Sequence, residues 1–261
     1  MGTGKMRGLI VLGLLGFLGG CGSDGSSAVV DAGQPAIDAG DVPPVLSSAE
    51  VFDESRIKTF ELTMTDADWQ HIQDNALDEE YVSGTLLYEG EHELGNIGIR
   101  FKGAVGSLAL CFQNGQQVCD KLSMKLKFNE YVQGQRFAGL KRINLHSMNS
   151  DPTKMHDAIG YRLFREAGLY APRTSYVRLV VNGESLGLYI AVEAIDGTFT
   201  DAFPDGGGGN LYKEVWPEHD QPAPYLAALK TNEDENPSVD KMLRFAADLE
   251  SAGDADFIST I

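Results

Sequence analysis

The stretch Lys121-Leu-Ser-Met-Lys-Leu-Lys-Phe128 organises the interpretation of the whole chain. Apolar and polar side chains alternate strictly along it, which indicates a strand with one buried face. Lys121, Lys125 and Lys127 fall on the other face. Residues 100–142 hold eight basic and two acidic side chains in a chain of net charge −17. This local positive field predicts an anionic ligand such as phosphate, although lysines that protect an exposed edge strand give the same pattern.

Further strands and hairpins are expected on both sides of this segment. Glu89-Gly90 and Asn182-Gly183 are turn sequences between alternating segments, so each predicts a hairpin. The expected strands are residues 57–64, 82–88, 96–102, 122–128, 143–146, 176–181 and 187–192.

Three helices are expected. Thr65 with Asp68 is typical of a helix N-terminus and opens a short helix. Asp151-Pro152 begins a second helix that ends at Gly168, and Ser238 caps a third. The side chains expected to face inward are Met155, Ile159 and Leu163 in the second helix and Met242, Phe245 and Leu249 in the third.

Several segments resemble one known family. They are the lysine strand, Gly134-Gln-Arg-Phe-Ala-Gly-Leu-Lys-Arg-Ile-Asn-Leu145, Asn149-Ser-Asp-Pro152, Leu163-Phe-Arg-Glu-Ala-Gly168, Ala171-Pro-Arg-Thr-Ser-Tyr-Val-Arg-Leu179 and Gly187-Leu-Tyr-Ile-Ala-Val-Glu193. Together they resemble the CotH (spore coat protein H) family of atypical secreted protein kinases over roughly residues 52–213. The resemblance implies phosphorylation of Ser or Thr in secreted or surface proteins, with ATP and Mg²⁺ or Mn²⁺ as cofactors.

The expected fold class is α+β. It consists of a curled antiparallel sheet with one packed helix, similar to the smaller lobe of an atypical protein kinase. We expect this lobe to span residues 49–213 and the start of a second, helical lobe to span residues 214–261. The strong negative charge argues against nucleic acid as a partner.

Lys125 is the first candidate for the lysine that contacts the ATP phosphates, because kinase lysines lie on a strand after a glycine-rich loop. Lys121 is the second candidate. The loop itself is Gly103-Ala-Val-Gly106-Ser107, which is also consistent with an ordinary turn. Asp157 is a candidate partner for the lysine or a simple helix-dipole charge. Glu193 is expected either to contact adenine or ribose or only to be solvated.

The catalytic residues are not identified in this chain. The resemblance implies that the aspartate and the metal ligands of the second lobe lie beyond Ile261, so we expect weak nucleotide binding and no measurable phosphotransfer. His156 stands where relatives often have arginine. The histidines show no metal-ligand spacing. The alternative function is a non-catalytic lipoprotein for surface binding or coat assembly.

The N-terminus indicates export. Residues 1–20 have basic residues followed by an apolar run, and Leu18-Gly-Gly-Cys21 resembles a bacterial lipobox. We expect lipid on Cys21, a disordered tether over residues 21–48 and an extracytoplasmic location on the cell envelope, at the outer membrane. Outside the cytoplasm, Cys111 and Cys119 are expected to form a disulfide.

Overall fold

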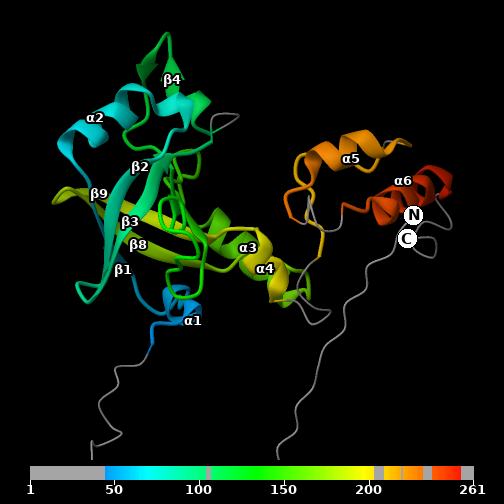
Figure 1. Cartoon of the computed structure of the whole chain (residues 1–261), viewed down its shortest axis with the longest axis horizontal. Helices are drawn as coiled ribbons and strands as arrows, with labels where there is room; N and C mark the ends of the chain where they lie inside the picture. The colour runs from blue at the N-terminus through cyan, green and yellow to red at the C-terminus, as the bar shows by residue number, and fades with distance from the viewer. Residues whose placement is uncertain (1–44, 104–106, 203–208, 219, 232–236, 254–261) are drawn as a thin grey trace, which may run out of the picture. The chain divides into compact units, whose positions relative to one another are not determined.

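The computed structural model describes residues 45–103, 107–202, 209–218, 220–231 and 237–253 (Figure 1). They lie in a compact unit that runs from Val45 to Ile261. The main strands are β1 (Lys58–Thr63), β2 (Val82–Tyr88), β3 (His92–Phe101), β6 (Met124–Lys127), β7 (Arg142–His146), β8 (Thr174–Val181) and β9 (Glu184–Glu193). The α-helices are α1 (Ser48–Val51), α2 (Asp66–Asp74), α3 (His156–Glu166), α4 (Gly197–Asp201), α5 (Pro222–Ala228) and α6 (Asp240–Ser251).

Within the described residues, seven strands close into a barrel in the order β1-β2-β3-β6-β7-β9-β8. Neighbouring strands are antiparallel except β1 and β8, which pair in parallel from Lys58 opposite Val177 to Leu62 opposite Val181. The expected fold class is therefore wrong, because the molecule forms a closed mixed barrel and not a curled antiparallel sheet packed with a helix. Closure follows from one parallel pairing between strands far apart in sequence, which no local turn signal reveals.

The interior of the barrel is filled by the apolar positions of the alternating strands. Ile99, Leu126 and Ile143 are paired across three neighbouring strands and are fully buried. Phe60 packs edge-on against Tyr88, with ring centroids 5.4 Å apart. The alternation in the lysine strand thus predicts its two faces correctly. Met124 and Leu126 point inward, whereas Lys125 and Lys127 are only partly buried.

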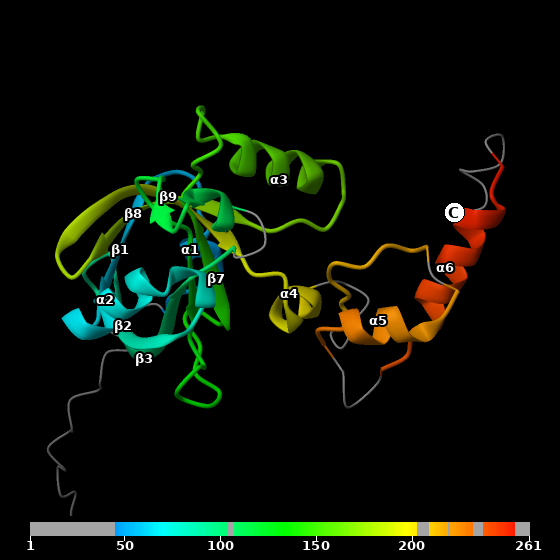
Figure 2. The same cartoon turned by 90° about the horizontal axis from the view of Figure 1, so that it is seen from above.

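Helix α3 lies against the outside of the barrel (Figure 2). It packs through Ala158 and Tyr161 onto a small cluster around Ile190 and Val192. The predicted inward stripe is wrong, since Met155, Ile159 and Leu163 are 45% to 58% exposed. A barrel fills its own core, so a helix outside it makes contact along only a narrow side.

Several local predictions are confirmed, and others need correction. The hydroxyl of Thr65 accepts the backbone N–H of Asp68 at the start of α2, as the capping pattern predicts. Helix α3 begins at His156 instead of Pro152, and a carboxylate oxygen of Asp151 accepts the His156 N–H. Ser238 does not cap α6, whose N-cap is Val239.

The inward face predicted for α6 is right for Met242 and Leu249, which are partly buried, and wrong for Phe245. Ala246 is the buried residue of this helix, whereas Phe245 is 39% exposed. Among the helices of the described ranges, none has the length and apolar character needed to cross a lipid bilayer.

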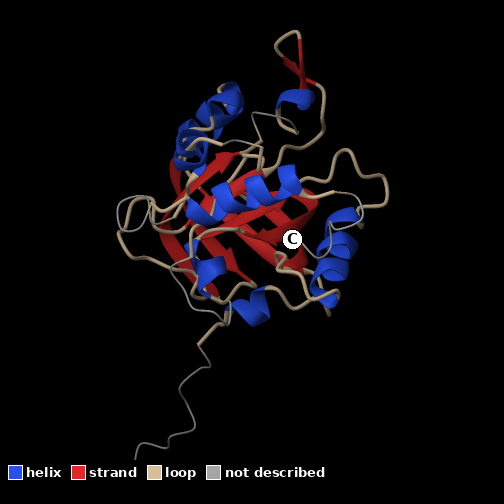
Figure 3. Ribbon diagram, turned by 90° about the vertical axis from the view of Figure 1, so that its right-hand side faces the viewer, coloured by secondary structure: helices blue, strands red, loops and turns tan. Residues whose placement is uncertain are grey.

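A small hairpin stands apart from the barrel strands (Figure 3). Its strands are β4 (Phe112–Gln113) and β5 (Gln116–Gln117), preceded by a 3-10 turn, η2 (Ala109–Cys111). The disulfide between Cys111 and Cys119 closes the base of this hairpin. It therefore fixes the connection between the glycine-rich loop and β6.

Candidate functional site

A row of polar side chains crosses the outer surface of β3, β6 and β7. The register places Arg100 beside Lys125 and Lys125 beside Asn144. In the next row, Lys127 of β6 lies opposite Arg142 of β7. The row arises because the inward positions of the same strands are apolar, so period-two alternation sends the cations outward.

Lys125 lies at the centre of this basic surface. Burial lowers the pKa of its ammonium most, and the neighbouring cations Arg100, Arg142, Lys213 and Lys102 lower it further, to about 8. Among the described residues, none accepts a hydrogen bond from this ammonium or forms an ion pair with it. A partly buried positive charge surrounded by other positive charges favours an anion beside it.

The neighbouring cations do have partners. Arg100 pairs with Glu79, and Arg142 lies 3.9 Å from a carboxylate oxygen of Asp196. The ammonium of Lys213 donates to the carbonyl of Ile195 at 2.6 Å. Carboxylates therefore offset the charges of Arg100 and Arg142, whereas Lys125 has neither a hydrogen bond nor an ion pair among the described residues.

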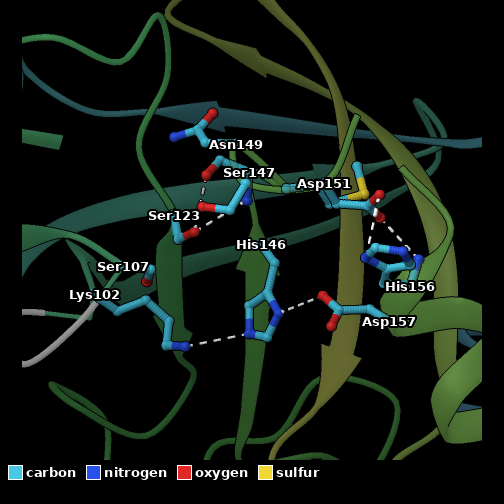
Figure 4. A pocket seen from close by; sticks show the side chains of 11 residues that line it. Lys102, Ser107, Ser123, His146, Ser147, Asn149, Asp151, His156 and Asp157 are labelled. Atoms are coloured by element: carbon cyan, nitrogen blue, oxygen red, sulfur yellow. Dashed lines mark hydrogen bonds and ion pairs between the residues drawn. The ribbon is translucent and has the colours of Figure 1, made fainter. Parts of the chain in front are cut away.

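A cavity of about 310 Å³ adjoins this surface at the ends of β3 and β7 (Figure 4). Lys102 enters it from the end of β3, His146 from β7 and Asp157 from the first turn of α3. The Lys102 ammonium lies 3.2 Å from Nε2 of His146, and Nδ1 of His146 lies 2.9 Å from Oδ2 of Asp157. The three side chains thus form a continuous chain from the sheet to the helix.

The protonation of this chain follows from its geometry. A lysine ammonium only donates, so Nε2 of His146 must accept its hydrogen, and the Nδ1–H then donates to Asp157. The hydrogen bond from His146 lowers the pKa of the Asp157 carboxyl. Burial lowers the pKa of Lys102, and the nearby Glu79 carboxylate partly opposes that change.

Glu79 binds the first residue of the glycine-rich loop. Its Oε1 accepts the backbone N–H of Gly103 at 2.5 Å, while the other oxygen pairs with Arg100. Gly103 has φ +104°, and a Cβ there would lie 2.6 Å from Oγ of Ser107, so the position requires glycine. The Gly103 N–H therefore has a protein partner already. Gly106 lies outside the described residues.

Asn149, which lines the cavity, contacts the disulfide hairpin and the segment that follows it. The Asn149 amide donates to Sγ of Cys111 at 3.2 Å and to the carbonyl of Lys121 at 2.7 Å. Deeper in the cavity, the Ser123 and Ser147 hydroxyls are 3.1 Å apart and both residues are buried. These contacts position the loop that joins β7 to α3.

Two predicted site residues lie elsewhere. Lys121 precedes β6, donates to the carbonyl of Leu188 and sits over the ring of Tyr189 at 4.6 Å. Glu193, at the end of β9, is buried and forms a two-pronged ion pair with Arg173. The structure thus brings Lys125 close to Lys102 but places neither Lys121 nor Glu193 with them.

The sequence interpretation did not single out Lys102 or His146. In the sequence, Lys102 is only one of eight basic residues over 100–142, and His146 is only one of five histidines without metal-ligand spacing. The period-two pattern contained a usable signal, because Arg100 and Lys102 lie on one strand face, as Asn144 and His146 do.

Metal binding has no visible basis in the described part of the chain. There, no three His, Cys, Asp or Glu side chains come together in a way that could hold a metal ion. The acidic residues of the site are instead paired with protein cations or with His146. The donor set present suits an anion.

Comparison with known proteins identifies the family. The model of the family described as CotH kinase protein matches residues 99–261, which include the end of β3, the lysine strand and α3. The chain belongs to the CotH family. It is also similar to the inner spore coat protein H of Bacillus subtilis (strain 168), with 27% identity over 66 residues. That similarity covers 25% of this chain and 18% of the relative, so the chain spans less than a fifth of the relative's length.

Proposed function

We propose that this CotH protein binds the phosphates of a nucleoside triphosphate on the basic surface formed by Arg100, Lys125 and Arg142. The observation that carries the proposal is Lys125, whose pKa is lowered to about 8 by burial and by neighbouring cations. An ammonium kept in such surroundings is destabilised until an anion neutralises it. The triphosphate of ATP has the charge and the acceptor oxygens to do so.

The wider proposal is ATP-dependent phosphorylation of Ser or Thr in a secreted or surface protein. It is supported by family membership and by the position of the basic surface next to the polar cavity. Lys125, Arg100 and Arg142 would hold phosphate oxygens, and Lys102 would reach the same ligand from the cavity. A divalent metal does not fit any group of described carboxylates, so we assign no metal ligand among the described residues.

Binding of radiolabelled ATP to the purified full chain tests the proposal. We expect weak binding that decreases as salt is added, because ions screen the attraction between the phosphates and a partly exposed cationic surface. The same samples, supplied with Mg²⁺ or Mn²⁺ and a mixture of envelope proteins, report phosphotransfer. Absence of ATP binding at low salt would contradict the nucleotide site itself, whereas binding without transfer would contradict only the kinase activity.

The second candidate function is a non-catalytic lipoprotein for surface binding or coat assembly. One specific observation favours it. The outer side of α3 exposes Ile159, Leu163 and Phe164, and its N-cap residue Met155 is exposed beside them, all at least 45% accessible. A row of large apolar side chains on one helix is a common feature of surfaces that contact other proteins.

We further propose that lipid on Cys21 anchors the protein at the outer membrane, facing away from the cytoplasm. Cys21 lies outside the described residues, so the support is the basic and apolar leader followed by Leu18-Gly-Gly-Cys21. A single anchoring residue predicts an all-or-none effect. Cys21→Ala should move the protein from the membrane fraction to the soluble fraction and abolish labelling by a radioactive fatty acid.

The double variant Cys111→Ala/Cys119→Ala is the matched control for cysteine loss, and it should remain in the membrane fraction. A Cys21→Ala protein that still sediments with membranes after a salt wash would contradict the anchor.

A further inference from the structure

His146 connects a cation of the barrel to a carboxylate of α3. It is the middle of the chain Lys102–His146–Asp157, with separations of 3.2 Å and 2.9 Å. Its side chain is 23% exposed, so it is largely removed from water but open to the cavity. The other charged or titratable side chains that line this cavity are Asp151 and His156, which face each other at 3.4 Å.

We propose that His146 is a positioning residue of the phosphate site, which ties Lys102 to α3 when neutral and gains a proton when a polyphosphate binds. This inference rests on the proposed function and assigns proton uptake to the same site. Neutral His146 accepts a hydrogen from the Lys102 ammonium and thereby aims it into the cavity. Protonated His146 cannot accept it and carries a second positive charge beside the ligand.

Two opposite effects on affinity follow from protonation. Lys102 loses the hydrogen bond that orients it, which corresponds to roughly a fivefold weakening of its contribution to phosphate affinity. The new unit charge a few ångströms from a phosphate strengthens binding by roughly tenfold or more at the effective dielectric of a protein surface. The charge effect is the larger, so affinity should rise as the pH falls.

The added proton comes from the solvent and is held on Nε2 of His146. The imidazolium keeps its Nδ1–H bond to the Asp157 carboxylate, and the added hydrogen on Nε2 becomes available to a phosphate oxygen. Lys102, released from Nε2, remains charged. Histidine side chains in general change charge near neutral pH, so measurements at pH 8 and pH 6 test the effect.

Calorimetric titration of the full chain with metal-free ATP tests the proposal. Wild-type protein should bind about tenfold more tightly at pH 6 than His146→Gln does. Measured in two buffers of different ionisation enthalpy, it should also take up more protons than the variant. Glutamine can accept from Lys102 and donate to Asp157, so His146→Gln should stay within about threefold of wild type at pH 8. His146→Leu, which breaks the chain, should be weaker at both values.

His71→Gln is the matched control. His71 is an exposed histidine paired with Glu80 outside the cavity, and its loss should leave the pH profile as in wild type. Comparing variants at each pH cancels the titration of ATP and of Lys125. Equal pH profiles and equal proton uptake for wild type and His146→Gln would overturn the proposal while leaving the nucleotide site intact. No detectable ATP binding by the wild-type protein would overturn both the nucleotide site and the role proposed for His146. Thermal unfolding verifies that each variant is folded. If His146→Leu does not fold, the comparison of His146→Gln with His71→Gln decides the proposal.

Discussion

Replacing Lys125 with methionine is expected to weaken ATP binding by about 10- to 100-fold and, at the same time, to stabilise the ligand-free protein. Binding falls because the cation without a described partner is the one that an anion would neutralise. Stability rises because methionine fills a similar volume without placing a charge among Arg100, Arg142, Lys102 and Lys213. Opposite changes in binding and stability are the signature of a site that keeps an unfavourable charge for its ligand.

The stability effect has a defined pH dependence. The pKa of Lys125 is lowered from 10.5 to about 8, so the folded protein holds this proton less tightly than the unfolded chain. The resulting destabilisation is complete below pH 8 and is relieved as the pH rises from 8 to 10.5. We therefore expect Lys125→Met to be more stable than wild type by about 1 to 2 kcal/mol at pH 7 and by progressively less toward pH 10. Urea unfolding at several pH values measures this difference.

Lys127→Met is the control on the same strand face. Lys127 already pairs with Glu130 and sits over the ring of Tyr81 at 5.6 Å, so its removal should change ATP affinity by less than about threefold. Equal losses of affinity in the two variants would show that the surface attracts phosphate through its summed charge, with no special role for Lys125.

Replacing Phe60 with alanine should destabilise the protein by about 4 kcal/mol. Phe60 is fully buried and contacts the rings of Tyr88 and Phe137, so its loss leaves a cavity inside the barrel. Its strand also carries both the antiparallel pairing to β2 and the parallel pairing to β8. For a domain of this size we expect the melting temperature to fall by about 8 to 16 °C.

Phe164→Ala provides the comparison for loss of an aromatic ring. Phe164 is 53% exposed on α3, so its removal should change stability by less than about 0.5 kcal/mol. Tryptophan fluorescence during urea unfolding measures both variants. A small loss of stability for Phe60→Ala would contradict a filled, closed barrel.

The strands could be predicted from sequence because their signals are local. Alternation identified β2 over its observed bounds, and Asn182-Gly183 correctly marked the turn between β8 and β9. The pairing of β1 with β8 could not be predicted in this way, since it depends on two segments with compatible faces and no shared turn. The face of α3 was wrong for a related reason. Hydrophobic periodicity identifies an apolar stripe, such as Ile159 and Leu163, but does not show whether anything covers it.

The candidate site was predictable in its charge and not in its connections. The excess of cations over residues 100–142 correctly indicated a basic surface with Lys125 on it. The link from Lys102 through His146 to Asp157 joins residues from three elements, so only the folded chain brings them together. The roles proposed for Lys125, Gly103, Ser107, Asp157 and Glu193 in nucleotide binding stay predictions.

The parallel pairing of β1 with β8 sets the time at which the barrel can be completed. Lys58 pairs with Val177, which is synthesised 119 residues later. At 5 to 20 residues per second, synthesis needs roughly 6 to 24 seconds to cover that distance. During this interval β1 can pair with β2, but its other row of backbone groups stays open. The newly made chain is therefore most prone to aggregate with other incomplete chains just before β8 is synthesised. Its first strand is among the last to complete its backbone hydrogen bonds.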